Sequence, residues 1–384
     1  QKALELIVRY GRVVAAERLC RVTWADLFCG AHGYLAVAGT GDFDALFSKM
    51  SLCSDETVHL SSMDAGCVCY SGVEADCTEV PGEMLMTARG QAHNLEVLRR
   101  VVDAGVILSG NCIPYMTGFI PTMGEHFVSC DSRAVLFMNS LWGACGNGDG
   151  IEASFCAAVC GRTPLAGMHL PENRVGNHRV EIRTAPTAIH DWDLLGYAIG
   201  SRMPAHAVPV IVGEFERPNA IQLKAFFAAL ACAAGTEMAH FVGMTPEAFT
   251  WEAAFGGGQP KGDLIITSRE IEATLTDLNP HPAQKIDYIT LGCPHYHADE
   301  LRKVAGCLEG RRIHADSRVD VWTTGPMKCM ADRAGHTATI EKAGARVVTG
   351  SCPSTRGYPH NVRTVAYDSA KQRHSAEQES DALK

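Results

Sequence analysis

The second half of the chain repeats one pattern: a short apolar run rich in β-branched residues, then a longer stretch with helical spacing of apolar residues. The runs include AVPVIVG, LIITS, KIDYITLG, VDVWTT and RVVTG, and the stretches between them include QLKAFFAALACAAG and ADELRKVAGCL. Strands that alternate with helices of this length predict βαβ units, which make the strands parallel and cover the sheet with helices. We therefore predict an α/β fold with parallel, doubly wound sheets.

The first half shows the same signal less regularly. QAHNLEVLRRVVDAG is an amphipathic helical stretch closed by Gly105, and VILSGNC follows it as a strand. The Pro- and Ala-rich segment MPAHAVPV, at 203–210, is the best candidate for a domain boundary. These observations predict a first α/β lobe over residues 1–203 and a second over 204–374, with a cleft between them. The polar segment 375–384 lacks periodicity, which predicts a disordered tail.

Three cysteines have matching sequence surroundings. Cys112, Cys293 and Cys352 lie in VILSGNCIP, YITLGCPH and RVVTGSCP, where an apolar run passes through Gly or Ser into Cys and Pro follows within two residues. Each thiol is expected at the carboxyl end of a strand, the edge of an open α/β sheet at which ligands bind. A single cysteine is commonly a small buried hydrophobe, but three matched ones predict an iron–sulfur cluster or another soft metal with an open position.

A polar, glycine-rich loop follows the first of these cysteines. Its side chains are dense enough to line a pocket, and the candidates are Glu125, His126, Asp131, Ser132, Asn139 and Ser140. A plain surface loop is the alternative for the first two. The stretch from Gly143 to Gly150 lacks the Lys-Ser/Thr ending of a P-loop, so it is weak support for nucleotide binding. Cys67 and Cys69 form a Cys-x-Cys pair without a partner at zinc-site spacing, which favours a structural interpretation.

Composition excludes several classes of protein. The chain has 384 residues, of which 46% are hydrophobic and 20% charged, as in ordinary globular proteins, and its formal charge of −9 argues against nucleic acid as a partner. We find neither an apolar stretch long enough to span a membrane nor a secretory leader, so we expect a cytoplasmic protein. In that setting the 16 cysteines indicate reduced thiols together with a metal or redox site.

Several motifs together point to a known family. GNCIPY, MGEHFVSCDSRAVLFMNSLWGA, GRTPLAGMHLPENR, ITLGCPH, VVTGSCP and VAYDSAK, in this order and spacing, resemble the large subunit of aconitase X along essentially the whole chain. The resemblance implies an iron–sulfur dehydratase with an aconitase-like fold that lacks the swivel domain. That small domain would be on a partner chain or fused. It also places the cluster ligands at Cys112, Cys293 and Cys352, and leaves open whether the cluster is 4Fe-4S, 3Fe-4S or 2Fe-2S.

The resemblance implies two possible substrates, cis-3-hydroxy-L-proline in bacterial members and mevalonate 5-phosphate in archaeal ones. Where members often read GARTNRE, this chain reads GACGNGDG and loses an arginine suited to phosphate. The usual Thr-Leu-Asn stretch is Ser62, Met63 and Asp64 here, and an acidic residue near the pocket would suit an ammonium group. We therefore favour hydroxyproline, dehydrated to a pyrroline-2-carboxylate.

Roles for individual residues follow as expectations. The iron would assist departure of hydroxide as a Lewis acid, and the family pattern assigns the base to a serine of the swivel domain, so this chain alone is expected to be inactive. We assign catalytic roles to Glu125, His126 and Ser132. Substrate contacts are expected from Ser62, Asp64, Asp131, Asn139, Ser140 and Lys371.

Two other interpretations remain open. One is a non-catalytic iron–sulfur or redox scaffold, in which the three thiols store a cluster or form a switch. The other is a zinc hydrolase that uses His295 and His297 beside Cys293, although no matching Glu-bearing helix accompanies the two histidines.

Overall fold

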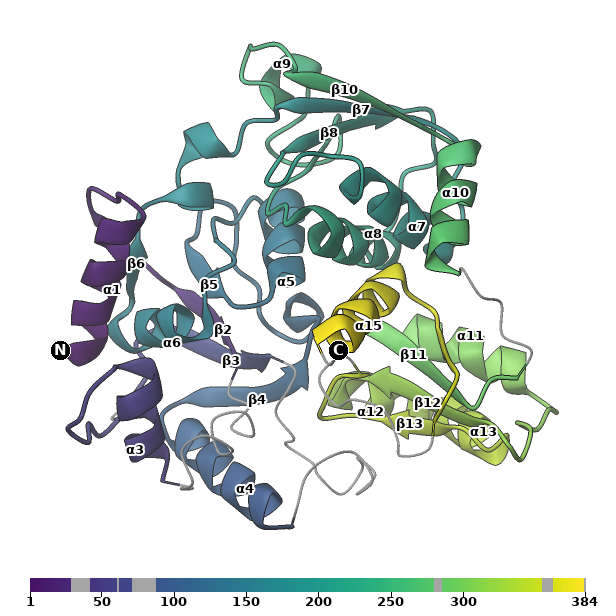
Figure 1. The fold of residues 1–384 in the computed structure, drawn as a ribbon, viewed down its shortest axis with the longest axis horizontal. Helices are drawn as coiled ribbons and strands as arrows, with labels where there is room; N and C mark the ends of the chain where they lie inside the picture. The colour runs from purple at the N-terminus through teal and green to yellow at the C-terminus, as the bar shows by residue number, and fades with distance from the viewer. Residues whose placement is uncertain (29–41, 61, 71–87, 280–284, 354–361, 383–384) are drawn as a thin grey trace.

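The computed structural model describes residues 1–384 apart from 29–41, 61, 71–87, 280–284, 354–361 and 383–384. Its described residues form three parallel four-stranded sheets and a small two-stranded antiparallel sheet (Figure 1). The prediction of an α/β fold with parallel sheets is confirmed. The sheets belong to three successive parts of the chain, which we call the first, second and third domains.

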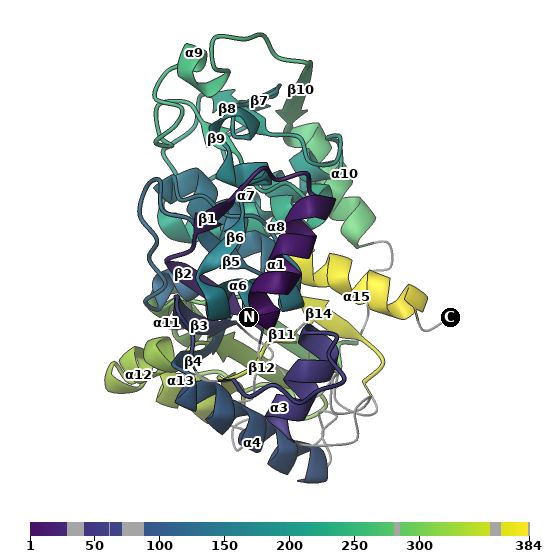
Figure 2. The same ribbon diagram turned by 90° about the vertical axis from the view of Figure 1, so that its left-hand side faces the viewer.

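The first domain has the strand order β4-β3-β2-β5. Its strands are β1 (Leu19–Arg21), β2 (Trp24–Leu27), β3 (Gly66–Tyr70), β4 (Val106–Asn111), β5 (Phe127–Ser129) and β6 (Arg162–Pro164), of which β1 and β6 form the two-stranded sheet. Its helices are α1 (Lys2–Val13), α3 (Phe43–Leu46), α4 (Ala88–Asp103), α5 (Ser132–Phe137) and α6 (Ile151–Cys160). In the turned view of Figure 2, α1 lies beside α6 and β6, which it contacts.

The second domain has the strand order β10-β7-β8-β9. Its strands are β7 (His178–Arg183), β8 (Pro209–Gly213), β9 (His240–Phe241) and β10 (Gly262–Thr267), and its helices are α7 (Ile189–Gly200), α8 (Ala220–Ala234), α9 (Trp251–Ala254) and α10 (Ser268–Leu278). Trp192, Phe226 and Phe241 belong to a buried cluster that continues into the first domain through Phe137 of α5. The first two domains therefore share one hydrophobic core.

The third domain has the strand order β13-β12-β11-β14. Its strands are β11 (Tyr288–Tyr296), β12 (Arg318–Thr323), β13 (Arg346–Val348) and β14 (Val365–Tyr367), and its helices are α11 (Ala298–Leu308), α12 (Gly325–Arg333), α13 (His336–Lys342) and α15 (Ala370–Ala382). In Figure 1, α15 lies between α8 and the sheet of the third domain, and it contacts α7 and α8. None of the described helices combines the length and apolar character that crossing a membrane requires.

The structure divides the chain differently from the two lobes that we predicted. A boundary at residue 203 falls between α7 and β8, yet β7 and β8 pair along five residues of the same sheet. The Pro- and Ala-rich segment that suggested the boundary is a connection within the second domain, between a helix and the next strand. A connection of this kind needs Pro and small residues as much as a domain linker does.

The predicted disordered tail also differs from the structure, because α15 continues through Ala382. Its first turn is anchored: Asp193 of α7 accepts a hydrogen bond from the Ala370 N–H at 2.7 Å, and Ser369 Oγ accepts one from Gln372 N–H at 3.0 Å. Nucleation is the costly step in helix formation. Residues after an anchored turn can therefore extend the helix without an apolar face of their own, and Ala, Gln and Glu favour it.

Candidate metal centre

The structure brings the three matched cysteines to one place between the first and third domains. Cys112 follows β4 directly, Cys293 lies within β11 and Cys352 follows β13, and their exposed fractions are 1%, 2% and 1%. Burial raises the pKa of the Cys293 thiol to about 11, Lys371 opposes this shift, and both other cysteines contribute to the rise. The three thiols therefore lie close enough to act on one another electrostatically.

A bulge in β11 presents Cys293 to this place. The pairing of β11 with β12 shifts register between Leu291 and Tyr296, so residues 292–295 leave the regular ladder. Gly292 has a φ of 101°, and a Cβ atom there would lie 2.3 Å from the backbone oxygen of Trp322. Only glycine fits this position without displacement of the neighbouring strand. We expected Cys293 after the end of a strand, and the strand instead continues past it to Tyr296.

Asp368 holds both ends of the bulge. Its carboxylate accepts a hydrogen bond from the N–H of Gly292 at 3.2 Å and another from the Tyr296 hydroxyl. Burial raises the pKa of Asp368 to about 6. This residue belongs to the VAYDSAK motif, so the segment that also carries Lys371 sets the conformation of the strand that carries Cys293.

Two glycines bring the other two cysteines together. Gly110 and Gly350 each precede a cysteine by two residues, and a Cβ atom on Gly110 would lie 3.4 Å from Cα of Gly350. Their φ angles are 55° and 78°, values that glycine adopts without steric cost. The shared Gly-x-Cys pattern of Cys112 and Cys352 thus reflects a close backbone approach between the ends of β4 and β13.

His295 connects all three cysteine-bearing segments. Its Nδ1 accepts a hydrogen bond from the N–H of Cys112 at 3.1 Å and lies 3.1 Å from the Cys112 sulfur, while its Nε2 lies 2.7 Å from the backbone oxygen of Ser351. This network requires the neutral imidazole with the proton on Nε2. Burial lowers the pKa of His295 to about 3, which favours the same neutral form. Sequence reasoning considered His295 only as a hydrolase ligand.

Two buried cations face the thiols. Lys371 Nζ lies 3.5 Å from the Cys293 sulfur. Burial and the Arg133 guanidinium lower the pKa of Lys371, but the three thiols outweigh them and leave the pKa raised. Arg133 is held by Asp131, whose carboxylate accepts from Nε at 2.6 Å and from Nη2 at 2.7 Å. The site therefore combines soft sulfur donors with positive charge suited to an anionic group of a ligand.

The predicted pocket residues fall into separate groups. Asp131 lies at the carboxyl edge of the first sheet, where it caps α5 and holds Arg133, and Ser132 is exposed beside it. Asn139 and Ser140 are buried and bind the backbone: the Asn139 amide contacts Gly146 and the Glu237 oxygen, and Ser140 Oγ accepts from Ala239 N–H. These hydrogen bonds of Asn139 and Ser140 therefore join parts of the protein to one another.

Four predicted residues lie at the opposite edge of the first sheet. Glu125 and His126 precede β5, whereas Asp131 follows it, and a three-residue strand at about 3.3 Å per residue separates them by roughly 10 Å. Glu125 accepts hydrogen bonds from the N–H and hydroxyl of Thr122 at 2.7 and 2.9 Å. Ser62 and Asp64 precede β3 and are exposed. The structure does not bring these four residues to the cysteines.

A buried carboxylate that we did not predict lies at the cysteine-bearing edge. Asp26 of β2 is fully buried, its Oδ2 accepts from Ser129 Oγ at 2.9 Å, and its Oδ1 has no hydrogen-bond partner among the described residues. Burial raises its pKa well above the ordinary value, and Asp131 and Cys112 add to the shift. The available signal was an acidic residue inside the apolar run TWADLF.

The geometry does not support a zinc hydrolase built on the histidines of β11. His297 caps α11, where its Nδ1 accepts from Asp299 N–H at 3.3 Å. Both ring nitrogens of His295 already contact Cys112 and Ser351. The described features instead define a three-domain α/β protein with a thiol-lined junction between its first and third domains.

Comparisons with known proteins identify the family. Residues 1–172, 176–276 and 286–382 match the models described as the first, second and third domains of aconitase X. The phosphomevalonate dehydratase large subunit of Methanothermobacter thermautotrophicus is 31% identical over 363 residues, which cover 92% of this chain and 83% of that protein. The chain belongs to the aconitase X family, as the motifs indicated.

Other relatives extend the comparison. The cis-3-hydroxy-L-proline dehydratases of Pseudomonas aeruginosa and Hypocrea jecorina are 34% and 33% identical over 72% and 71% of this chain, which spans only 49% and 47% of their length. The holo-form crystal structure of Thermococcus kodakaraensis aconitase X superposes with a TM-score of 0.81 at 23% identity, covering 98% of this chain and 90% of that one. The fold is therefore that of aconitase X, whereas similar identities leave the substrate open.

Proposed function

We propose that this chain is the large-subunit part of an iron–sulfur dehydratase, in which Cys112, Cys293 and Cys352 hold the cluster. The observation that carries the proposal is the junction itself, where three buried thiols from two domains lie beside Lys371. Thiolates are the usual protein ligands of iron–sulfur clusters, and three of them leave a coordination position for another ligand. The histidine and backbone contacts around Cys112 are of the kind that orient a metal ligand.

We further propose that the substrate is cis-3-hydroxy-L-proline. Removing water from a 3-hydroxy amino acid requires a base for the Cα proton and assistance for the departing hydroxide. When bound, the cluster supplies Lewis acidity for that departure. In this proposal Lys371 binds the substrate carboxylate; it is supported by the positive charge of Arg133 beside it and by the exposed Ser132 at the same edge. The base, a serine, comes from the small swivel subunit, and the enamine product tautomerises to a pyrroline-2-carboxylate.

The alternative substrate is mevalonate 5-phosphate, named in several relatives. Of the two arginines in GARTNRE, one falls at Gly148 here, beside Ser132 at the cysteine-bearing edge: a Cβ on Gly148 would lie 4.0 Å from Cα of Ser132. The N–H of Gly148 instead donates to the Glu237 carboxylate at 2.7 Å. An acidic group where relatives have a guanidinium disfavours a phosphate. Asp64, our second sequence argument for hydroxyproline, no longer supports that substrate, because Asp64 lies at the edge of the first sheet opposite the cysteines.

One experiment separates the candidate functions. The chain is reconstituted anaerobically with iron and sulfide, combined with its small subunit, and supplied separately with cis-3-hydroxy-L-proline and mevalonate 5-phosphate. We expect turnover of hydroxyproline alone, and loss of at least tenfold in turnover for Lys371→Met with Lys303→Met as the exposed control. Turnover of mevalonate 5-phosphate would establish the alternative substrate. A complete cluster without turnover of either compound would indicate a non-catalytic scaffold.

A further inference from the structure

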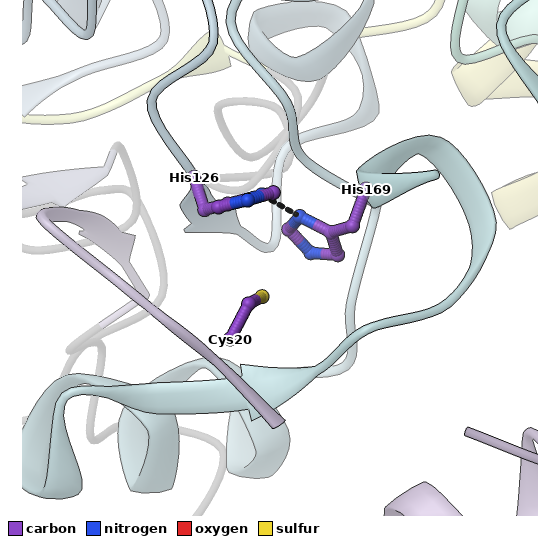
Figure 3. A group of neighbouring side chains, drawn as sticks. All are labelled: Cys20, His126 and His169. Carbon is purple, nitrogen blue, oxygen red and sulfur yellow. Dashed lines mark hydrogen bonds between the residues drawn. The ribbon is translucent and has the colours of Figure 1, made fainter. Parts of the chain in front are cut away.

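A second group of metal-binding side chains lies away from the cysteine junction. Cys20 of β1, His126 before β5 and His169 each offer one ligand atom, and these atoms lie within 4.8 Å of one another (Figure 3). The figure shows the two imidazoles facing each other above the Cys20 sulfur, and their Nδ1 atoms are 3.1 Å apart. The proposed dehydration uses none of these residues.

The spacing of the group suits a tetrahedral ion. Two imidazole nitrogens bound to zinc at about 2.0–2.1 Å lie roughly 3.3 Å apart in tetrahedral geometry, close to the 3.1 Å observed. His126 is half-buried and His169 is buried, and zinc binds an imidazole in its neutral form. His169 is 2% exposed.

Cys145 is the candidate for a fourth ligand beside the group, although its sulfur is not among the ligand atoms that lie within 4.8 Å of one another. It forms a parallel bridge with His126, and its backbone N–H and oxygen pair with Glu125 and Phe127 on either side of that histidine. Residues paired in this way project their side chains to the same face. Cys145 and Cys20 lie close enough to interact electrostatically.

We propose that Cys20, Cys145, His126 and His169 bind one zinc ion as a structural site. Two thiolates and two imidazoles are a set that zinc prefers for closed, structural coordination. The four residues come from β1, from the chain on both sides of α5 and from the segment after β6. Zinc would therefore fasten the two-stranded sheet and its N-terminal segment to β5 and the first domain.

The test uses the full chain with its proposed cluster ligands removed. In the variant Cys112→Ser/Cys293→Ser/Cys352→Ser, purified with chelator, we expect zinc titration to show one equivalent bound and a higher thermal midpoint. Cobalt in place of zinc should give a sulfur-to-cobalt charge-transfer band and intense visible bands of a tetrahedral ion. Adding Cys20→Ser should abolish zinc binding, whereas Cys160→Ser, at a half-buried cysteine outside the group, should leave it at one equivalent.

Two further variants keep the test decisive if Cys20→Ser does not fold. His169→Gln should lose the zinc equivalent, and Cys145→Ser should weaken the sulfur-to-cobalt band, each with an unchanged far-ultraviolet circular dichroism spectrum. The proposal is overturned if the cluster-free variant binds no zinc, or if Cys20→Ser and His169→Gln both retain one equivalent. A cobalt spectrum without sulfur ligation would equally contradict it.

Discussion

Lys224 and Glu300 form a buried ion pair that joins the second domain to the third, directly behind the cysteine junction. Lys224 Nζ lies 2.5 Å from Glu300 Oε2 and 2.9 Å from the backbone oxygen of His295, and the side chains are 1% and 6% exposed. Lys224→Met leaves the Glu300 carboxylate buried without its cation. It also removes the hydrogen bond that Lys224 donates to the backbone oxygen of His295, in the segment that carries Cys293. Removing one partner of a buried pair costs about 3–5 kcal/mol, and we expect that loss in the free energy of unfolding.

The double variant distinguishes this account from simple loss of packing. Glu300 Oε2 also accepts the N–H of His297 at 2.8 Å, a contact that Gln can keep while losing the charge. Lys224→Met/Glu300→Gln no longer buries an unpaired carboxylate, so it should recover about 1–4 kcal/mol of the loss. Urea unfolding of the metal-free chain, followed by circular dichroism, measures each free energy.

A matched lysine provides the control. Lys303 is 53% exposed and pairs with Asp299 at 3.2 Å, so Lys303→Met should change the free energy of unfolding by less than about 1 kcal/mol. If Lys224→Met costs no more free energy of unfolding than Lys303→Met, the buried ion pair does not stabilise the protein as described. The same conclusion follows if the double variant is destabilised by the sum of its two single changes, because additive losses would mean that the charges do not interact.

Three other predictions follow from single sites. Gly292→Ala should destabilise the protein by about 1–3 kcal/mol or more, because residue 292 has a positive φ and the added Cβ would collide with the backbone of Trp322. Gly306→Ala in α11, where nothing lies near the added Cβ, should stabilise the protein by up to about 1 kcal/mol. Equal urea midpoints for the two variants would contradict this. Burial raises the pKa of Asp193 to about 7, so the folded state holds a proton that the unfolded state releases above about pH 4. Stability from this group should therefore fall between about pH 4 and 7 by up to roughly 1.4 kcal/mol per pH unit, and a slope unchanged in Asp193→Asn would be the wrong result. Lys371→Met should weaken binding of a carboxylate substrate in equilibrium dialysis, and affinity equal to that of the unaltered chain would remove Lys371 from the site.

The positions of Cys112 and Cys352 after strands could be predicted because their signal is local, whereas Cys293 lies within β11. An apolar run, a glycine and a cysteine within nine residues indicate a strand and its exit, and the carboxyl edges of parallel strands are where such exits meet. The sequence alone does not show that the three cysteines meet across two domains. Their meeting depends on the contact between Gly110 and Gly350 and on the bulge at Gly292, and both features join residues far apart in the chain.

The pocket loop could not be resolved in the same way. Glu125, His126 and Asp131 are neighbours in sequence, yet the three-residue strand β5 between them is too short to show alternation, and it sends them to opposite edges of the sheet. Asn139 and Ser140 looked available because a sequence does not show which backbone groups a buried amide or hydroxyl satisfies. The domain count failed for a related reason, since Pro and Ala mark connections within a sheet as well as linkers between domains.

Cluster content of cysteine variants tests the central claim most directly. After anaerobic reconstitution with iron and sulfide, the unaltered chain should carry both elements together with the visible absorption of an iron–sulfur cluster. Cys112→Ser, Cys293→Ser and Cys352→Ser should each lose most of that absorption and of the bound iron, while Cys307→Ser, at an exposed cysteine of α11, should retain both. If the three single variants keep the full iron, sulfide and absorption of the unaltered chain, these cysteines do not hold a cluster and the account is wrong.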